Sequence, residues 1–466
     1  MSNASDRLRL LALVRDHAVD AVAFQGLSDR MHVWFDEASL PTSRSAAVAY
    51  FDTGSAWIAA GGPISRQSDR SNVARRFVEA GKLARRRVSF FAVEDLNGFS
   101  GWETLHLGEQ PTTSPREWID ALARTRPMRE QLRRARAKGV RASLKSAREL
   151  DPTGPLRGRI DDLLARWLAS RRIEPMAFLV QTDPYCLPEE HLYVVTTRGD
   201  DVVGLLSAVP AYGGCGWLVE HLVCARGSPN GTAETLVDAL HRSLIEDGKP
   251  NDRVSLGLAP LSGRTTAWMR EARTLARPLF DFEGLRRFKA RLHPTEWRAI
   301  WLVTPAGTSA LVALADALTA FAGGSLVRFA LRSLFLHARG LLWLLAVGLV
   351  PWTALLLWLN WTHEAGVAGY SSVALAWWIA FDVVLAAGLF RAAFRPANLT
   401  LLALIAASST DAILSVMHLH DVGLGPTLAD SALRLSAAVA PCIGATTLLA
   451  VTLQRRRERS RSGERR

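Results

Sequence analysis

Cysteine is scarce in this sequence: its 466 residues include only four, at Cys186, Cys215, Cys224 and Cys442. No two of them form a CxxC pair, so we expect neither a disulfide framework nor a metal site. A long apolar run is also missing near the N-terminus, where the run from Leu10 to Val14 is too short for the core of a signal peptide. The N-terminal domains are therefore expected to stay in the cytoplasm.

Apolar and basic residues, by contrast, are abundant. Hydrophobic residues make up 49% of the chain, which includes 15 tryptophans, and the mean hydropathy is positive, so a membrane portion is expected. Lysine and arginine total 56 against 44 acidic residues, which gives a net charge of +12 and a pI near 10.2. Such an excess favours an anionic partner, and nucleic acid and anionic lipid are the two candidates.

The C-terminal third carries four apolar segments long enough to cross a bilayer. The first, Leu341 to Trp361, has 21 residues without a charge and would span about 31 Å as a helix. The others are 371–390, 398–417 and 435–453. Arginines cluster in the joint 391–396 and in the tail 455–466, whereas the other two loops have no lysine or arginine. The positive-inside rule therefore places both chain ends in the cytoplasm, with four crossings of a bacterial inner membrane.

Two aspartates, Asp382 and Asp411, lie inside these apolar segments. A carboxylate is costly there, so each should face a polar partner or a cavity. They either mark a path for a lipid headgroup or pair locally with Ser408, Ser409 or Thr410.

The stretch from Gly213 to Leu261 shows the clearest order of elements. Val219 to Cys224 predicts a short strand that stops at the breaker-rich sequence ARGSPNG. From Thr232, apolar residues recur at helical spacing until Gly248, and a second strand is predicted over 254–258. Strand, glycine-containing turn, helix and strand is the order found in the acyl-donor half of the N-acetyltransferase-like (GNAT) fold, where amide groups at the helix N-terminus hold an anionic or carbonyl group.

The first part of the chain repeats this order. SAAVAYFDTG and SAWIAAGGPI predict strands that end in glycine turns, a helix is predicted from Ser71 to Arg87, and VSFFAVE predicts the next strand. An internal duplication of one GNAT-like unit explains the repeat economically. The alternative is an α/β protein in which this order arises without duplication.

Three spaced motifs carry a family resemblance. SPNGTAETLVDAL, LGLAPLSG and GLRRFKARLHPTEW occur in this order, and together they resemble the C-terminal domain of the bacterial phosphatidylglycerol lysyltransferases, the multiple peptide resistance factor family. The resemblance covers roughly residues 20–335. It implies two fused GNAT-like folds that move an amino acid from aminoacyl-tRNA onto a lipid headgroup. The chain departs from the family in having Glu220-His221-Leu222-Val223 in place of an Asp-Leu-Met-Arg-like sequence, and in its membrane part following the catalytic region.

Two candidate catalytic side chains, Glu220 and His221, lie on the predicted strand before the PNG turn. Alternation along a strand places Glu220 on one face with Leu218 and Leu222, and His221 on the other. A carboxylate flanked by leucines is expected to have a raised pKa, which suits a general acid or base near neutral pH. Glu220 is favoured because the family has its acid at this position. The alternatives are a carboxylate that pairs with an arginine or orients the turn, and a structural role for His221.

The turn itself supplies two further catalytic candidates, Asn230 and Gly231. Asn230 can adopt left-handed geometry or cap the helix, and Gly231 lets the backbone come close to a donor carbonyl or phosphate. An oxyanion formed when a lipid hydroxyl attacks an aminoacyl ester would be stabilised there. In users of acetyl-CoA the loop is Gln/Arg-x-x-Gly-x-Gly/Ala, and Pro229 in place of the first glycine removes an N–H, which disfavours coenzyme A.

Substrate-binding candidates flank the turn and occupy the later motif GLRRFKARLHPTEW. That motif is predicted to form a donor-contacting or membrane-surface helix, or else a solvated basic face. The substrate-binding candidates are Arg226, Glu234, Asp238, Arg286 and Lys289.

A basic segment lies between the two predicted units. Residues 124–148 hold ten basic residues and one acid, Glu130, and are predicted to be largely helical. The segment is either a solvated surface helix or a track for the phosphates of tRNA, whose binding should weaken steeply with salt. Anionic lipid headgroups would suit the same charges. The tRNA-binding candidates are Arg129, Arg133, Arg134, Arg136 and Lys138.

The sequence thus predicts two tandem GNAT-like α/β folds followed by an all-α four-helix transmembrane region. The predicted parts are an N-terminal GNAT-like domain (1–123), a basic connecting helix (124–155), a catalytic GNAT-like domain (156–308), interfacial helices (309–340), a transmembrane domain (341–454) and a basic tail (455–466). The predicted activity is transfer of an amino acid from aminoacyl-tRNA to a lipid such as phosphatidylglycerol, without a cofactor. Two other interpretations stay open: an acyltransferase that uses acyl-CoA or acyl carrier protein, and a non-catalytic lipid-binding or transport module.

Overall fold

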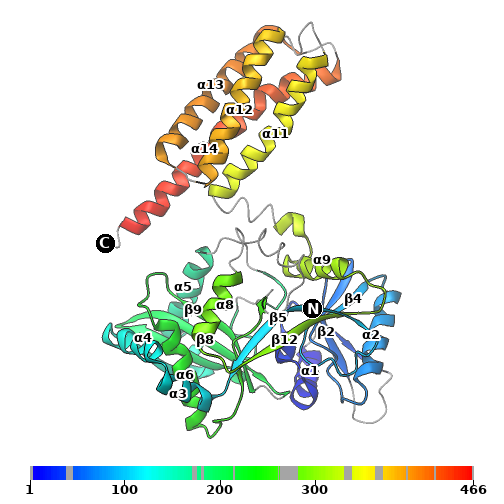
Figure 1. The fold of residues 1–466 in the computed structure, drawn as a ribbon, viewed down its shortest axis with the longest axis vertical. Helices are drawn as coiled ribbons and strands as arrows, with labels where there is room; N and C mark the ends of the chain where they lie inside the picture. The colour runs from blue at the N-terminus through cyan, green and yellow to red at the C-terminus, as the bar shows by residue number, and fades with distance from the viewer. Residues whose placement is uncertain are drawn as a thin grey trace. The chain divides into compact units, whose positions relative to one another are not determined.

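The computed structural model forms two compact units, Met1–Phe329 and Ala330–Arg466 (Figure 1). The structure describes residues 4–37, 46–170, 176–179, 183–213, 216–260, 262, 282–329, 338–362, 371–394, 397–424 and 427–463.

A twelve-stranded mixed sheet forms the centre of the first unit. Its strands follow the order β1-β2-β3-β4-β12-β5-β10-β9-β8-β7-β6, and β11 pairs with β5. The strands are β1 (His32–Phe35), β2 (Ala47–Asp52), β3 (Ala56–Ala60), β4 (Arg87–Val93), β5 (Glu103–Thr113), β6 (Val140–Lys145), β7 (Leu192–Arg198), β8 (Asp201–Ala211), β9 (Gly216–Cys224), β10 (Val254–Ser255), β11 (Ala259–Pro260) and β12 (Glu296–Thr304).

The same strand–turn–helix–strand unit occurs twice in this sheet. In the first part β3, α2 (Arg70–Leu83) and β4 follow one another, and in the second part β9, α6 (Thr232–Glu246) and β10 do so. The pairs β3–β4 and β9–β10 are parallel, whereas the other strand pairs of the described sheet are antiparallel. A helical crossover is needed to join parallel neighbours, which explains why both helices lie where they do. The predicted fold class, α/β followed by an all-helical region, is confirmed.

The two predicted soluble domains share this sheet and are not joined by a linker. β12 comes late in the chain, yet it lies between β4 and β5 and is antiparallel to both. β5 in turn pairs with β10 of the second part. Because β12 lies between β4 and β5, strands from both parts meet at the centre of one sheet. Met1–Phe329 therefore forms a single compact unit.

Helices cover both faces of the second part of the sheet. Trp118 of α3 (Pro115–Arg124) and Leu236 of α6 pack with alternate residues of β7 and β8, such as Val194 and Leu206. On the opposite face, α5 (Pro155–Ala169) buries an apolar stripe, including Ile160, Leu163 and Leu164, against the remaining residues of these strands. The period-two alternation of β7 and β8 therefore supplies both cores.

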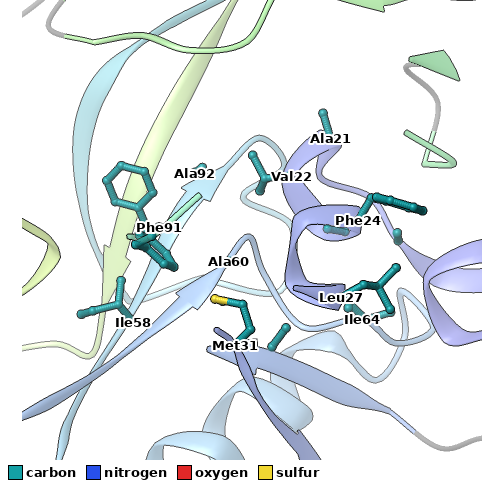
Figure 2. Close-up of a cluster of buried hydrophobic side chains, with 14 of the residues drawn as sticks. Ala21, Val22, Phe24, Leu27, Met31, Ile58, Ala60, Ile64, Phe91 and Ala92 are labelled. Carbon is teal, nitrogen blue, oxygen red and sulfur yellow. The ribbon is translucent and has the colours of Figure 1, made fainter. Parts of the chain in front are cut away.

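A short 3₁₀ helix, η1 (Ala21–Leu27), connects the two parts of the sheet. All seven of its residues are buried. Its apolar side chains, such as Phe24 and Leu27, share one core with Ile58 of β3, Val209 of β8 and Leu218 of β9. Figure 2 shows the side of this cluster formed by η1, β3 and β4. Because η1 touches strands from both parts, it is placed to link them physically.

The basic segment differs from the single helix that was predicted. It forms α3 (Pro115–Arg124), α4 (Arg126–Ala137) and the edge strand β6. A capping box at Ser114 starts α3, and Gly139 adopts φ +84° after α4, which turns the chain out of the helix. Charge density alone did not reveal this break.

The second unit consists of four long apolar helices. They are α11 (Ala338–Thr362), α12 (Ser372–Phe394), α13 (Asn398–Val422) and α14 (Leu428–Gly463). By length and composition each is able to cross a membrane, so the four predicted apolar helices are confirmed. α14 runs on through most of the predicted basic tail. Of the predicted interfacial segment, the structure describes α9 (Ala310–Phe321) and residues up to 329, whereas 330–337 lie outside the described residues.

Candidate active site

Glu220 lies at a β-bulge, where β9 has one more residue than β8. Ser207 pairs with His221, but the next residue of β8, Ala208, pairs with Val219. Glu220 therefore has no partner across the ladder. A bulge of this kind bends the strand and re-aims a side chain, and bulges are common next to active sites.

The bulge changes which side chains share a face. Leu218, before it, packs with η1, whereas Leu222, after it, packs on the α6 side. The prediction that Leu218, Glu220 and Leu222 lie on one face was therefore wrong. Glu220 and His221 instead lie close together on the face turned towards η1.

Three side chains surround the Glu220 carboxylate. Gln25 of η1 donates from Nε2 to Oε1 at 3.1 Å, and His191 Nε2 and His221 Nδ1 each lie 3.6 Å from Oε2. Burial acts to raise the pKa of Glu220, but His191, His221 and Gln25 outweigh it, and the net shift is downward. The predicted raised pKa was therefore wrong, and Glu220 is ionised at neutral pH.

His221 has a second polar neighbour. Its Nδ1 lies 2.7 Å from the hydroxyl of Ser207 on β8. The imidazole is buried and bridges this hydroxyl and the Glu220 carboxylate. Its observed contacts are those of a residue that orients Glu220, and its predicted catalytic role stays a prediction.

The PNG turn lies at the start of α6 and packs against α4. Gly231 is the N-cap residue with φ +97°, and a Cβ there would come 2.3 Å from the Gln131 carbonyl oxygen. Only glycine fits this position without strain. Asn230 is exposed, and its side chain does not cap the helix. Within the described residues, no recorded contact joins Glu220 to either turn residue, so the structure does not bring these candidates together.

Asp238, a substrate-binding candidate, is engaged inside the fold. Its Oδ1 accepts from Trp118 Nε1 at 3.0 Å, and its Oδ2 accepts from Arg136 at 3.2 Å and Arg242 at 3.0 Å. These contacts tie α3, α4 and α6 together. Of the other candidates near the turn, Glu234 lies in the first turn of α6 and Arg226 is exposed.

Lys289 is buried beside the bulge. It lies on α8 (Phe282–Arg291), and Nζ donates to the carbonyl oxygens of Gly257 at 2.8 Å and Leu258 at 2.9 Å. Gly257 also faces the carbonyl of Val219, the residue before Glu220. Burial lowers the pKa of Lys289 to about 7. A lysine that is partly neutral at physiological pH is a functional-site candidate.

Arg286 lies one turn before Lys289 on α8. It is half-exposed, its guanidinium stacks over the Trp297 ring at 5.0 Å, and it lies 3.7 Å from the Glu109 carboxylate. The predicted donor-contacting motif thus has one buried cation, Lys289, and three exposed ones, Arg286, Arg287 and Arg291.

Two of the five predicted tRNA-binding residues are used to hold helices together. Arg129 donates to the carbonyl oxygens of Leu122 and Ala123 at the end of α3. Arg136 pairs with the buried Asp238. Both side chains therefore have structural partners.

The other three tRNA-binding candidates are exposed. Arg133 and Arg134 both pair with Glu130 at 2.8 Å, and hydrogen bonds from Arg133 and then Arg134 lower the Glu130 pKa to about 2. Lys138 follows the last residue of α4. One carboxylate is thus shared by two guanidinium groups, which leaves net positive charge on this surface of α4.

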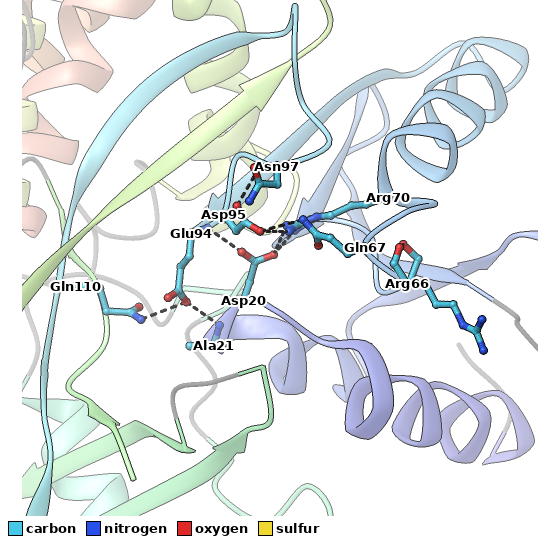
Figure 3. A network of polar contacts seen from close by, with 11 residues as sticks. Asp20, Ala21, Arg66, Gln67, Arg70, Glu94, Asp95, Asn97 and Gln110 are labelled. Carbon is cyan, nitrogen blue, oxygen red and sulfur yellow. Dashed lines mark hydrogen bonds and ion pairs between the residues drawn. The ribbon is translucent and has the colours of Figure 1, made fainter. Parts of the chain in front are cut away.

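At the glycine turn after β3, a carboxylate of the protein itself occupies the place of an anion. Figure 3 shows this carboxylate, Asp20, beside Arg70 and Glu94. Asp20 Oδ2 accepts from the amide of Gly62 at 2.7 Å and from Arg70 at 3.1 Å, and its Oδ1 accepts from the amide of Glu94 at 2.7 Å. Arg70, the first residue of α2, is fully buried and also reaches Asp95 at 3.3 Å. The groups that would hold an anion at this turn are therefore already engaged.

Sequence analysis missed Gln25 and His191, the partners of Glu220, and also Glu94. Gln25 is 195 residues away from Glu220, and neither it nor His191 belongs to a motif. Glu94 accepts from the amide of Ala21 and from Gln110, and burial together with the nearby Asp20 raises its pKa to about 7. A buried polar residue in an apolar run, such as Gln25 in AVAFQGL, is the only signal that could have pointed to this region.

Comparison with known proteins places this arrangement in a family. Residues 12–304 match the profile described as "Phosphatidylglycerol lysyltransferase, C-terminal". No curated protein matches the sequence. The structure is similar to the C-terminal domain assigned to a lysylphosphatidylglycerol synthetase of Agrobacterium fabrum, with 22% identity, 70% of this chain and 99% of that chain covered, and a TM-score of 0.57.

It is also similar to the structure of L-PGS from Bacillus licheniformis, with 17% identity, 67% and 96% of the two chains covered, and a TM-score of 0.55. At these identities the structures establish a shared fold and nothing further. The profile match, however, covers more than half of the chain and includes both strand–turn–helix–strand units. The chain therefore belongs to the phosphatidylglycerol lysyltransferase C-terminal family.

Proposed function

We propose that this protein is a membrane-anchored aminoacyltransferase that moves an amino acid from aminoacyl-tRNA to a hydroxyl of a membrane lipid such as phosphatidylglycerol. Family membership supports transfer to a lipid, and the four apolar helices support an anchored enzyme. The observation that carries the assignment of the site is the buried Glu220 carboxylate, which its neighbours keep ionised at the bulge.

Glu220 is proposed to hold the α-ammonium group of the aminoacyl ester. A buried carboxylate with a lowered pKa keeps its charge, and a charge-assisted hydrogen bond to an ammonium group is strong and directional. The same low pKa makes Glu220 a weak proton acceptor. An orienting role therefore suits it better than that of general base.

Lys289 is proposed to accept the proton of the lipid hydroxyl. In the neutral amine, two N–H groups can serve the carbonyls of Gly257 and Leu258 while the lone pair stays available. A pKa of about 7 suits proton transfer near neutral pH. The lipid oxygen would attack the ester carbonyl, the bond to the ribose oxygen would break, and Lys289 would return the proton to that ribose oxygen.

Backbone groups are proposed to stabilise the charge that develops. The bulge leaves Glu220 outside the ladder with β8, which makes its amide a candidate donor for the oxyanion. Asn230 and Gly231, at the start of α6, suit a carrier phosphate better because they lie at a helix N-terminus away from the Glu220 carboxylate. No cofactor takes part in this scheme, in which aminoacyl-tRNA is the co-substrate.

The exposed cations of α4 are proposed to contact the tRNA backbone. Arg133, Arg134 and Lys138 have side chains that reach solvent, and phosphate binding needs charge rather than a fixed pocket. Because aminoacyl-tRNA is cytoplasmic, the first unit and both chain ends are proposed to face the cytoplasm, in agreement with the arginine distribution.

The test is a transfer assay with the full chain in phosphatidylglycerol liposomes. Aminoacyl-tRNA charged with a mixture of radioactive amino acids should yield labelled lipid, and RNase treatment of the donor before mixing should abolish the label. Lipid mass spectrometry would then identify the amino acid and the acceptor. Label that survives RNase, or transfer from radioactive acyl-CoA alone, would contradict the proposal.

A further inference from the structure

The four-helix unit buries two acidic side chains that the transfer reaction does not use. Asp382 of α12 is 6% exposed and Asp411 of α13 is 7% exposed. Each lies within a helix long and apolar enough to cross a membrane. Ionisable groups in such segments are costly and typically mark ion or substrate sites.

Both aspartates line one cavity inside this unit. The cavity has a volume of about 50 Å³, and Ser415, Ala437 and Pro441 also line it. Ser415 donates to Asp411 Oδ1 at 3.1 Å. Among the described residues, none donates a hydrogen bond to Asp382, and none of the described arginines, lysines or histidines pairs with either carboxylate. A buried carboxyl group that faces a cavity without a partner is neutralised either by a proton or by a cation that enters the cavity.

Two residues of α14, Ala437 and Pro441, also line this cavity, and Pro441 interrupts the hydrogen bonding of the helix. Pro441 has no N–H, so the carbonyl of Ala437, one turn earlier, loses its usual helical partner. The Pro441 carbonyl in turn accepts a hydrogen bond from Ser408 at 3.3 Å. Carbonyls freed at helix interruptions coordinate Na⁺ in membrane transporters. The cavity is thus lined by two carboxyl groups, a hydroxyl and the residue whose carbonyl is freed, and its other walls are apolar: Trp352, Leu356, Leu375, Trp378 and Leu433.

The size and the donor set restrict the ligand. One water molecule needs roughly 10–15 Å³ of such space, so about 50 Å³ admits a small ion with a few waters but no lipid headgroup or amino acid. The described residues contain no group of three or more His, Cys, Asp or Glu side chains placed to share a metal ion. Oxygen donors select hard cations, and a site with only two carboxylates is poor for Ca²⁺, which takes six to eight oxygens.

We propose that this cavity between α11, α12, α13 and α14 binds a monovalent hard cation, with Na⁺ as the ion that fits, through Asp382, Asp411, Ser415 and the Ala437 carbonyl. The bound ion would compensate one negative charge while the two carboxyl groups share one proton, and it would hold α12, α13 and α14 together. Such a site is independent of aminoacyl transfer, so the two proposals can fail separately.

The test uses the full chain in detergent at fixed pH and ionic strength, with NaCl, KCl or choline chloride as the salt. Binding to the native state alone should raise the Tm in Na⁺ over that in choline by about 2–4 °C. Asp382→Asn and Asp411→Asn should each remove this difference. Asp421→Asn, a change at an exposed acid of the same unit, should preserve it.

Direct binding of ²²Na⁺ keeps the proposal testable if either variant folds poorly. Wild-type protein should bind about one ion per chain, and excess unlabelled Na⁺ should displace it more effectively than choline. Absence of bound ²²Na⁺ would overturn the proposal. So would a Tm difference that persists in both asparagine variants, or a response to divalent cations alone.

Discussion

The two strand–turn–helix units of the first compact unit share their order of elements but differ in what fills them. In the β3–α2 unit, the turn amide of Gly62 binds the Asp20 carboxylate, and Arg70 closes the site from within. In the β9–α6 unit, the turn before the helix has the exposed Asn230, and a bulge places Glu220 among histidines. The β3–α2 unit thus binds a side chain of the protein itself at its turn. The β9–α6 unit leaves polar groups available for a ligand.

This difference assigns separate tasks to the two halves. Asp20 precedes η1, and η1 carries Gln25, which hydrogen-bonds Glu220. In the first half, the turn filled by Asp20 thus fixes η1. In turn, η1 positions Glu220 of the second half through Gln25. A unit whose turn is filled internally can in this way support the candidate site of the other unit.

The largest effect on activity is expected from Lys289→Met, in the second half. Loss of the proposed proton acceptor should lower the transfer rate by about 10²–10⁴-fold. The Tm should not fall, because an ammonium group no longer has to be buried. The folded-state pKa of about 7 lies below the unfolded value of about 10.4, so the cost of Lys289 is full below pH 7 and fades as pH rises towards 10.4.

Liposome assays and thermal unfolding of the same preparations would check this pair of outcomes. Wild-type activity should also rise with pH through about 7, as Lys289 becomes neutral. Retention of full activity by Lys289→Met would exclude the lysine as proton acceptor.

Asp20→Asn, in the first half, should differ from Lys289→Met, because its main effect should be a loss of stability. Breaking a buried charge pair by removing one partner typically costs about 3–5 kcal/mol of unfolding free energy. Asp52→Asn is the matched control, because its ion pair with Arg86 is partly exposed and such pairs contribute only about 0–1 kcal/mol. Denaturant unfolding measures both. Equal losses in the two variants would remove the structural role assigned to the filled turn.

A triple variant of α4, Arg133→Gln, Arg134→Gln and Lys138→Gln, should weaken tRNA binding without changing the chemistry. KM for aminoacyl-tRNA should rise and kcat should stay constant. The slope of log affinity against log salt should become shallower by about one for each phosphate contact that is lost. Lys82→Gln, at an exposed cation of the first half, is the control. An unchanged salt slope would indicate that these three cations face solvent and do not contact tRNA.

The smallest effect is expected from Gln25→Leu, because Gln25 is a positioning residue. Loss of one hydrogen bond to a charged group should cost about 1.5 kcal/mol, or about tenfold in rate. Gln25 helps to lower the Glu220 pKa, so its removal should raise that pKa and move to higher pH the further loss of rate that lies below the Lys289 limb. Gln25→Glu tests the same contact with a negative charge like that of Glu220. A uniform loss at all pH values would indicate a packing defect instead.

Sequence reasoning predicted what periodic patterns encode and missed what depends on register. The strands, α6 and the four apolar helices follow from local alternation, helical spacing and length, and the motifs predicted the family. The bulge at Glu220 could not be predicted, because it arises where β9 meets Ser207 and Ala208 of a neighbouring strand. The lowered pKa of Glu220 depends on Gln25 and His191, which come close only in the folded chain.

The charge pattern predicted the basic segment but not the contacts of its individual residues. The basic segment was recognised, yet Arg129 caps α3 and Arg136 pairs with the buried Asp238, contacts that need the tertiary packing of three helices. The insertion of β12 between β4 and β5 was equally hidden, since strand order is not a local property.

The measurement that tests the central claim most directly is calorimetric titration of the full chain with a non-hydrolysable 3′-amide analogue of aminoacyl-adenosine. The account predicts one site per chain, because the first glycine turn is filled by Asp20. It also predicts that Glu220→Gln abolishes this binding, whereas Asp52→Asn retains it. Two sites per chain, or undiminished binding by Glu220→Gln, would contradict it.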